Sequence, residues 1–273
     1  MIARLLRSRA ALLGLGLLSL VLLAALLAQP LYPGDPFDIV ARANLWPGSN
    51  PHYPLGTDML GRDIAAGVLH AARVSLLVGL GAATLAVLLG TSIGVVSGYF
   101  GGWVDDALMR ATELFQTMPA FLFAILLVVI LQPSVASIVF AIGITAWPQI
   151  ARLVRAEALR VRRQDYIAAA LTMGLAHPKI IWRHVLPNSI APVVVATSIL
   201  VAQAILTEAS LSFLGLGDPS VISWGSMVGA GRSSLRTAWY MTAIPGLAIF
   251  VTVMAFMYVG NGLNDVLNPR SDP

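Results

Sequence analysis

The chain alternates between long uncharged, apolar runs and shorter segments that carry most of its charge and proline. The runs cover residues 10–28, 74–99, 114–131, 135–150, 189–207 and 237–264. A helix needs about 20 apolar residues to cross the hydrocarbon core of a bilayer. The fourth run is short by itself, so we expect its helix to continue past Arg152. The pattern predicts an all-α, polytopic membrane protein with six transmembrane helices.

The composition points to the same class of protein. Of the 273 residues, 58% are hydrophobic and only 11% are charged, whereas soluble domains carry about 25% charged residues. We therefore expect a single membrane domain with four parts. These are an amino-terminal segment with the first span (1–29), an external proline-rich loop (30–69), the transmembrane domain (70–264) and a cytoplasmic tail (265–273). The chain has no cysteine, which excludes disulfide and thiolate chemistry.

The most basic segment, residues 152–188, lies between the fourth and fifth runs and holds seven of the seventeen Lys and Arg residues. Cationic loops between spans stay on the cytoplasmic side of the membrane. We therefore expect this loop and both chain ends to lie in the cytoplasm. This asymmetry explains the basic net charge better than a nucleic-acid partner does, because no platform of alternating basic and aromatic residues is visible.

The outer loop and the first span each allow a second interpretation. A basic start followed by the 10–28 run is also typical of a cleaved signal peptide. We prefer a retained span, since its removal would leave the new amino end outside. Asp58, Arg62 and Asp63 could be mistaken for a catalytic or metal cluster. No nucleophile or ligand spacing accompanies them, so we expect them to stabilise the loop.

Small and acidic residues mark the second and third runs. Gly90, Gly94 and Gly98 recur every four residues, a spacing that lets another helix pack closely. Residues 100–110 are expected to form a short inner loop. Glu113 lies near the inner end of the third run, where a carboxylate is either functional or simply solvated. Both interpretations of Glu113 remain open.

Two short helices are predicted inside the basic loop. One covers the alanine-rich stretch from Tyr166 to Gly174, where the glycine is suited to end a helix. The other starts at His177 and Pro178, since proline is tolerated in a first turn. A helix faced with alanine can lie close to a groove on a partner protein. The alternative is an amphipathic connector that rests on lipid headgroups.

The loop sequences YIAAALTMG and IIWRHVLPN resemble the "EAA" loop of ABC importer permeases, in the branch that carries dipeptides, oligopeptides and nickel. In that family the loop forms the coupling helix that docks on an ATPase subunit. The resemblance assigns to this helix Tyr166, Ala168, Ala169, Ala170, Gly174 and His177. It assigns to the tail of the loop Arg183, His184, Pro187 and Asn188. Ala168 stands where the motif often has Glu, which puts in doubt a salt bridge to the ATPase from this position.

Three further stretches extend the resemblance over residues 54–270. They are LGTDMLGRD at 55–63, EASLSFLGLG at 208–217 and WGSM at 224–227. From the last two we take Glu208, Ser212, Trp224 and Met227 as candidates for a solute path or gate. Glu208 has a second interpretation, in which hydrogen bonds to this buried carboxyl stabilise a bend. Trp224 and Trp239 are suited to the membrane interface.

The resemblance implies the type I ABC importer permease fold in a bacterial inner membrane. It also implies a homologous permease as partner in a heterodimer, an external solute-binding protein and two ATPase subunits that bind ATP and Mg. The chain itself is expected to bind no cofactor or metal. The implied solutes are di- or oligopeptides, with nickel or a metallophore as the alternative.

The sequence also argues against other functions. The only lysine, Lys179, follows proline, so the chain has no phosphate-binding loop of the G-x-x-x-x-G-K-[ST] type. Energy must therefore come from another polypeptide. A channel or secondary transporter working alone usually places ionisable residues near the membrane midplane. Such a transporter, or an intramembrane enzyme, is a distant alternative because Glu208 is the only carboxylate at a suitable depth.

Overall fold

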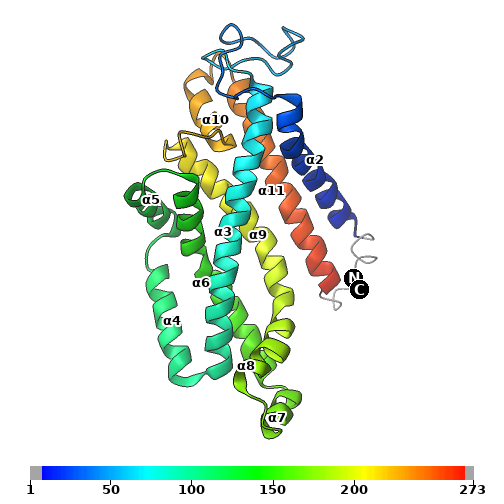
Figure 1. Cartoon of the computed structure of the whole chain (residues 1–273), viewed down its shortest axis with the longest axis vertical. Coiled ribbons are helices and arrows are strands. Elements are labelled where there is room, and N and C mark those ends of the chain that lie inside the picture. The colour runs from blue at the N-terminus through cyan, green and yellow to red at the C-terminus, as the bar shows by residue number, and fades with distance from the viewer. Residues whose placement is uncertain (1–7, 268–273) are drawn as a thin grey trace.

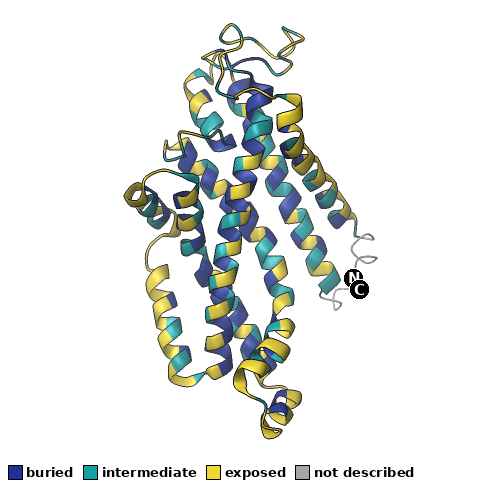
Figure 2. Cartoon of the chain, in the orientation of Figure 1, coloured by how far each residue is buried: buried dark blue, intermediate teal, exposed yellow. Residues whose placement is uncertain are grey.

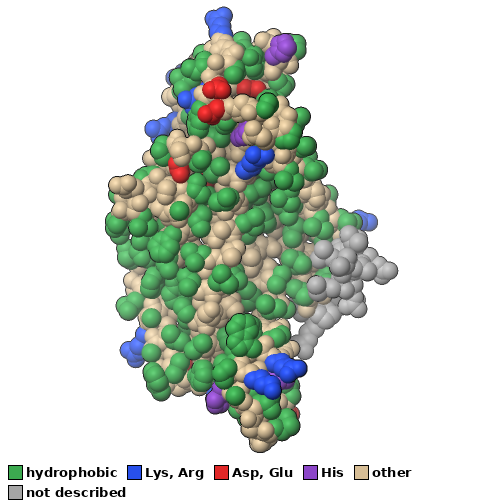
Figure 3. Space-filling view, in the orientation of Figure 1, with side chains coloured by type: hydrophobic (Ala, Val, Ile, Leu, Met, Phe, Trp, Pro, Cys, Tyr) green, Lys and Arg blue, Asp and Glu red, His purple; other side chains and the backbone are tan. Residues whose placement is uncertain are grey.

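Five long helices run side by side in the computed structural model, which describes residues 8–267 (Figure 1). They are α2 (Arg9–Leu31), α3 (Ile64–Phe100), α6 (Val135–Arg162), α9 (Leu186–Phe213) and α11 (Tyr240–Leu267). Each is long and apolar enough to cross a membrane. Hydrophobic side chains cover the middle of the visible face, and charged side chains gather towards its two ends (Figure 3). The predicted all-α membrane fold is confirmed for this part of the chain.

The third apolar run is not one straight span. It is divided between α4 (Gly102–Gln116) and α5 (Ala120–Leu131), which are bent by 80° relative to each other. Pro119 precedes α5, and proline has no N–H with which to continue a helix. If the bent pair counts as one span, the described residues contain up to six. The predicted inner loop at 100–110 was wrong, because most of it forms the first turns of α4.

Helices α3 and α6 pack closely along the predicted glycine face. A Cβ atom added to Gly90 would lie 2.6 Å from Ile150 Cβ, and one added to Gly98 would lie 2.6 Å from the carbonyl oxygen of Arg155. The two backbones therefore touch where these glycines occur, as the spacing predicts. Figure 2 shows buried residues along the inner sides of the long helices, so this contact belongs to the core.

The outer loop is shorter than predicted, because α3 begins at Ile64 rather than after residue 69. The Asp63 carboxylate accepts a hydrogen bond of 2.8 Å from the N–H of Ala65 and so caps α3. The Asp58 carboxylate accepts a bond of 2.8 Å from the N–H of Arg62. The Arg62 guanidinium lies 5.1 Å from the centre of the Phe37 ring. These contacts confirm that the three charged residues stabilise the loop.

The two described ends of the chain lie together. A Cβ added to Gly14 of α2 would be 2.6 Å from the backbone nitrogen of Val259 in α11, so the first span packs tightly against the last. Residues 1–7 and 268–273 of the predicted amino-terminal segment and tail lie outside the described residues. Of the residues predicted to form the tail, 265–267 are described and lie in α11.

Candidate coupling site

The alanine-rich stretch of the basic loop forms α7 (Asp165–Thr172), at the end of the molecule far from the outer loop (Figure 1). Gly174 ends it with φ of +77°, a backbone conformation that glycine adopts without steric cost. Its N–H donates to the carbonyl of Leu171 at 3.0 Å, and the N–H of Leu175 donates to that of Ala170 at 3.1 Å. These two bonds form a Schellman cap, so the predicted end of this helix is confirmed.

Helix α7 has one buried side and one exposed side. Ile167 and Ala170 are buried, so Ala170 packs towards the chain's own core rather than towards a partner. Ala168 and Ala169 are exposed, and Met173 is 71% exposed. The exposed side, which also carries Tyr166, is therefore a small-residue surface bordered by larger apolar side chains. Such a surface lets the backbone of α7 approach a partner closely.

A second short helix, α8 (His177–Ile180), follows as predicted and leads through a π-helical turn at Ile181–Val185 into α9. His177 lies on the surface, but its Nδ1 is 2.8 Å from the hydroxyl of Tyr99 at the end of α3. The Tyr99 side chain is buried. This contact joins the predicted coupling loop to the longest helix of the bundle. Short π-helical segments occur frequently at functional sites.

The tail of the loop positions the start of α9. Pro187 is the second residue of α9 and directly follows the π-helical turn. The Asn188 amide donates to the carbonyl of His184 at 2.6 Å. The His184 ring lies 6.2 Å from that of Tyr166, which brings the tail next to α7. Arg183 is exposed and contributes to the basic surface of the loop.

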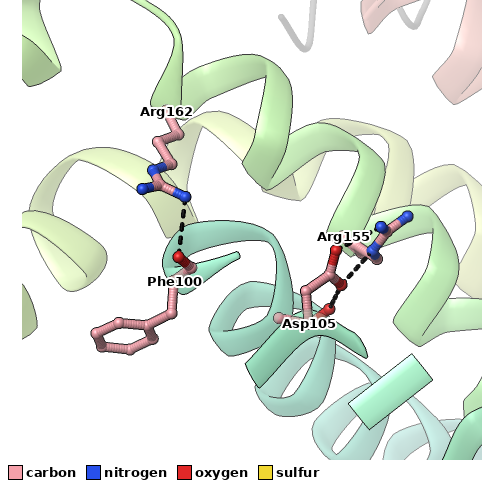
Figure 4. A network of polar contacts seen from close by, with 5 residues as sticks. Phe100, Asp105, Arg155 and Arg162 are labelled. Carbon is pink, nitrogen blue, oxygen red and sulfur yellow. Dashed lines mark hydrogen bonds and ion pairs between the residues drawn. The ribbon is translucent and has the colours of Figure 1, made fainter. Parts of the chain in front are cut away.

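A polar cluster that the sequence analysis missed fixes α6, the helix that leads into α7. We call Ser97, Asp105 and Arg155 the Asp105 cluster (Figure 4). Arg155 Nε and Nη2 each lie 2.5 Å from an Asp105 carboxylate oxygen, and the Ser97 hydroxyl donates to the same carboxylate. Nearby, the Arg162 guanidinium donates to the Phe100 carbonyl at 3.0 Å. Five residues of α3, α4 and α6 thus take part in these contacts, next to the basic loop.

The sequence holds no local signal for the Asp105 cluster. Asp105 lies within the predicted inner loop, and Arg155 lies in the segment where the fourth helix was expected to continue. A bidentate carboxylate–guanidinium pair is among the strong, directional contacts in proteins. Nothing in the sequence pairs these two residues, because residues 100–110 were not expected to be helical.

Two of the four candidates for a solute path or gate, Glu208 and Ser212, lie with Ser75 in a second cluster, which we call the Glu208 cluster. Glu208 is only 2% exposed. Its carboxylate accepts hydrogen bonds from the Ser212 hydroxyl at 2.7 Å and from the Ser75 hydroxyl at 3.4 Å. Gly215 follows the end of α9 and has a φ of +85°. This geometry favours a structural role for Glu208, because its carboxyl group links α9 to α3.

The other two candidates for a solute path or gate, Trp224 and Met227, lie in α10 (Trp224–Gly231). Trp224 is 2% exposed, and its indole N–H donates to the Val68 carbonyl at 3.0 Å. The expectation that Trp224 lies at the membrane interface was therefore wrong, because α10 turns its ring into the core. Trp239 is exposed, as an interface residue should be. Met227 lines a pocket of about 180 Å³ together with Asp63 and Met241.

A bundle of apolar spanning helices with a basic, helical loop at one end is the arrangement predicted for an importer permease. A family model described as binding-protein-dependent transport system inner membrane component matches residues 90–273. The chain belongs to this family, which confirms the family predicted from its motifs. It is therefore a multi-pass component of the inner membrane.

Individual relatives agree with this assignment. The chain is 39% identical to the glutathione transport system permease protein GsiD of Pectobacterium atrosepticum, over 93% of this chain and 85% of that protein. It is 35% identical to the dipeptide transport system permease protein DppC of Alkalihalophilus pseudofirmus, over 97% and 87% of the two chains. Its fold is similar to a chain of the inward-facing MetNI methionine ABC transporter, with a TM-score of 0.61 at 14% identity, over 74% of this chain and 96% of that chain.

Proposed function

We propose that this chain is the permease subunit of an ATP-binding-cassette importer for di- or oligopeptides. It pairs with a homologous permease, receives solute from an external binding protein, and is driven by two ATPase subunits on the cytoplasmic side. The observation that carries this proposal is the exposed alanine side of α7, held on the end of α6. The names of the full-length relatives, which refer to dipeptide and glutathione transport, support a peptide solute.

The mechanism starts with an ATPase bound to Ala168, Ala169 and Met173. When ATP closes the two ATPases, α7 moves with them. Its movement reaches α6 through the continuous chain and reaches α3 through the contact between His177 and Tyr99. The close packing of α3 on α6 then transmits the motion as a rigid unit. The bundle rocks between inward-open and outward-open arrangements, each stabilised by different ligands.

Uptake in whole cells tests this function. Cells that lack only this chain are compared with cells in which it is restored, using a labelled dipeptide, a longer labelled peptide and labelled nickel. We expect restored uptake of at least one peptide and no change for nickel. Rescue of nickel alone would assign the alternative solute. No change for any of the three would contradict the peptide importer.

Docking of the ATPase has a separate test, because an amphipathic connector on lipid would also expose apolar side chains. The ATPase subunits should copurify with the wild-type chain and should be lost from a variant with Ala169→Arg. Ala111→Arg on the exposed side of α4 is the matched control, since it adds the same charge away from the loop. Equal copurification of ATPase with both variants would contradict docking on α7.

A further inference from the structure

Gln203 places a carboxamide inside the apolar part of the bundle, on an exposed side of α9. Its depth follows from the contact between α9 and α3. A Cβ atom added to Gly79 would lie 2.6 Å from Ile205 Cγ1, and Gly79 lies in the uncharged run 74–99. The Gln203 side chain is therefore level with the membrane-spanning part of α3.

Lipid is an unsuitable environment for this side chain. A carboxamide has two N–H donors and a carbonyl acceptor, which hydrocarbon leaves unsatisfied. Within residues 8–267 the Gln203 amide makes no hydrogen bond, although the Thr207 hydroxyl donates to the Gln203 backbone carbonyl at 2.8 Å. Polar groups at such depths usually face the bundle interior or a water-filled cavity. We therefore expect the surface around Gln203 to meet water or another polar molecule.

A groove between α9 and α5, which we call the α5–α9 groove, begins one helical turn from Gln203. Leu206 and Phe213 of α9 and Phe121 of α5 line it, and all three side chains are exposed. Leu206 lies three residues after Gln203, so both lie on the same side of the helix. The volume of the groove is about 440 Å³, within the range of about 300–1,000 Å³ that is typical of small-molecule sites. In the described part of the chain, none of the residues that line it is charged.

The wall of the groove on α5 adjoins the break in the third span. Phe121 follows this break closely, and residues 117–120 are all exposed. The break lies at membrane depth, because the ring of Phe115 is 5.3 Å from that of Trp147, which packs on Gly90 of α3. Irregular backbone at this depth is tolerated where protein covers it or where it lines a water-filled cavity. The break thus indicates, independently of α9, that this side of the molecule does not face lipid.

A peptide solute satisfies the Gln203 amide better than a neighbouring helix does. A helix of a partner permease bonds its own backbone groups internally, so it offers only its side chains. A peptide in a water-filled path has free N–H and C=O groups, which match the acceptor and the donors of a carboxamide. The α5–α9 groove adds apolar surface for peptide side chains and no charge that would select among them.

We infer that Gln203 and the α5–α9 groove line the solute path, where the amide binds the peptide backbone and the groove receives apolar side chains. This site rests on the proposed peptide function and deepens it. It lies on the exposed side of α9, whereas the motif residues Glu208 and Ser212 are buried in the same helix. Because the amide recognises the backbone unit that all peptides share, the path is expected to accept peptides of varied sequence.

The first experiment measures whether water reaches the groove in the complete transporter in nanodiscs, without the binding protein. This chain has no cysteine, so a substituted cysteine is unique within it. Leu206→Cys is compared with Leu77→Cys, the matched control, because Leu77 is 57% exposed and lies two residues before Gly79. A charged, water-soluble methanethiosulfonate should label Leu206→Cys at least about tenfold faster, since the reactive thiolate forms in water and not in lipid. Labelling as slow as that of Leu77→Cys would show that lipid or the partner permease covers the groove, which would overturn the site.

The second experiment uses Leu206→Cys in the same complex to measure peptide binding. Dialanine should slow its labelling, and dialanine with a methylated peptide nitrogen should do so at least about tenfold more weakly, because it cannot donate to the Gln203 carbonyl. Adding Gln203→Leu should abolish this difference between the two peptides. Gln29→Leu in α2 is the matched control, since it makes the same change away from the groove, and it should keep the difference. A difference that persists with Gln203→Leu would overturn the site.

Transport by the same complex separates failure of the site from failure of the proposed function. The Leu206→Cys complex is reconstituted with the binding protein and assayed for dialanine uptake. Uptake by a complex whose labelling dialanine does not slow would overturn the site and leave the proposed function standing. If the wild-type complex transports no peptide, the proposed function fails and the site fails with it.

Discussion

Burial of the Glu208 carboxyl group costs free energy, and its hydrogen bonds offset this cost while they join neighbouring helices. A carboxyl group this deeply buried is unfavourable unless it is hydrogen-bonded. Here the two donors come from different places, Ser212 in the same helix and Ser75 in α3. The Ser75 hydroxyl also accepts a bond of 3.3 Å from the N–H of Trp224. The carboxyl group therefore links α3, α9 and α10 at the outer end of the bundle.

Two substitutions at Glu208 separate a structural role from a role in the solute path. Glu208→Gln keeps the size and an acceptor oxygen, so the purified transporter should keep its thermal stability and its uptake. Glu208→Ala should lower stability by about 2–4 kcal/mol, because it leaves a cavity and two hydroxyls without a partner. Thermal unfolding and peptide uptake are measured together. A stable Glu208→Gln variant without uptake would instead assign Glu208 to the solute path.

Helix α3 packs closely on helix α6 because the glycines of α3 have no side chain at the contact. A Cβ atom on residue 90 would lie 2.7 Å from the carbonyl oxygen of Trp147, and a backbone atom cannot move aside easily. Gly90→Ala should therefore destabilise the protein by about 1–3 kcal/mol. Gly246→Ala in α11 is the control, since nothing lies within 4 Å of the added atom.

The control should be neutral or slightly stabilising, because alanine favours a helix over glycine by about 1 kcal/mol. The measurement is the thermal unfolding of both purified variants in the same detergent. Equal melting temperatures would show that α3 and α6 can separate without loss of stability. Close packing would then not explain how motion passes between them.

The sequence predicts the long helices well, but it does not predict helix α4 or the contacts of the Asp105 cluster. Apolar runs fix the spans because each must satisfy its own backbone in lipid, and Gly174 fixes the end of α7 through local chemistry. Helix α4 is amphipathic, so a search for apolar runs misses it. The pairing of Asp105 with Arg155 and the burial of Trp224 depend on tertiary contacts between distant segments. No local pattern encodes those contacts.

For the whole molecule, coupling requires that a small surface on α7 moves a bundle of long helices. The loop is attached to the bundle at three places. These are the continuous chain from α6, the contact of His177 with Tyr99, and the π-helical turn that leads into α9. The orientation of α7 relative to these attachments depends on the cap at Gly174. A change at this glycine should therefore affect transport without affecting the membrane fold.

Gly174→Pro and Gly174→Asn test this coupling directly. Proline fixes φ near −65° and removes the N–H that bonds to Leu171, so it cannot adopt the observed φ of +77°. Asparagine tolerates this conformation, and nothing lies within 4 Å of an added Cβ. Gly174→Pro should abolish uptake while membrane insertion remains normal, whereas Gly174→Asn should retain most uptake. Uptake is measured at matched membrane levels of the chain, and normal transport by the proline variant would contradict coupling through α7.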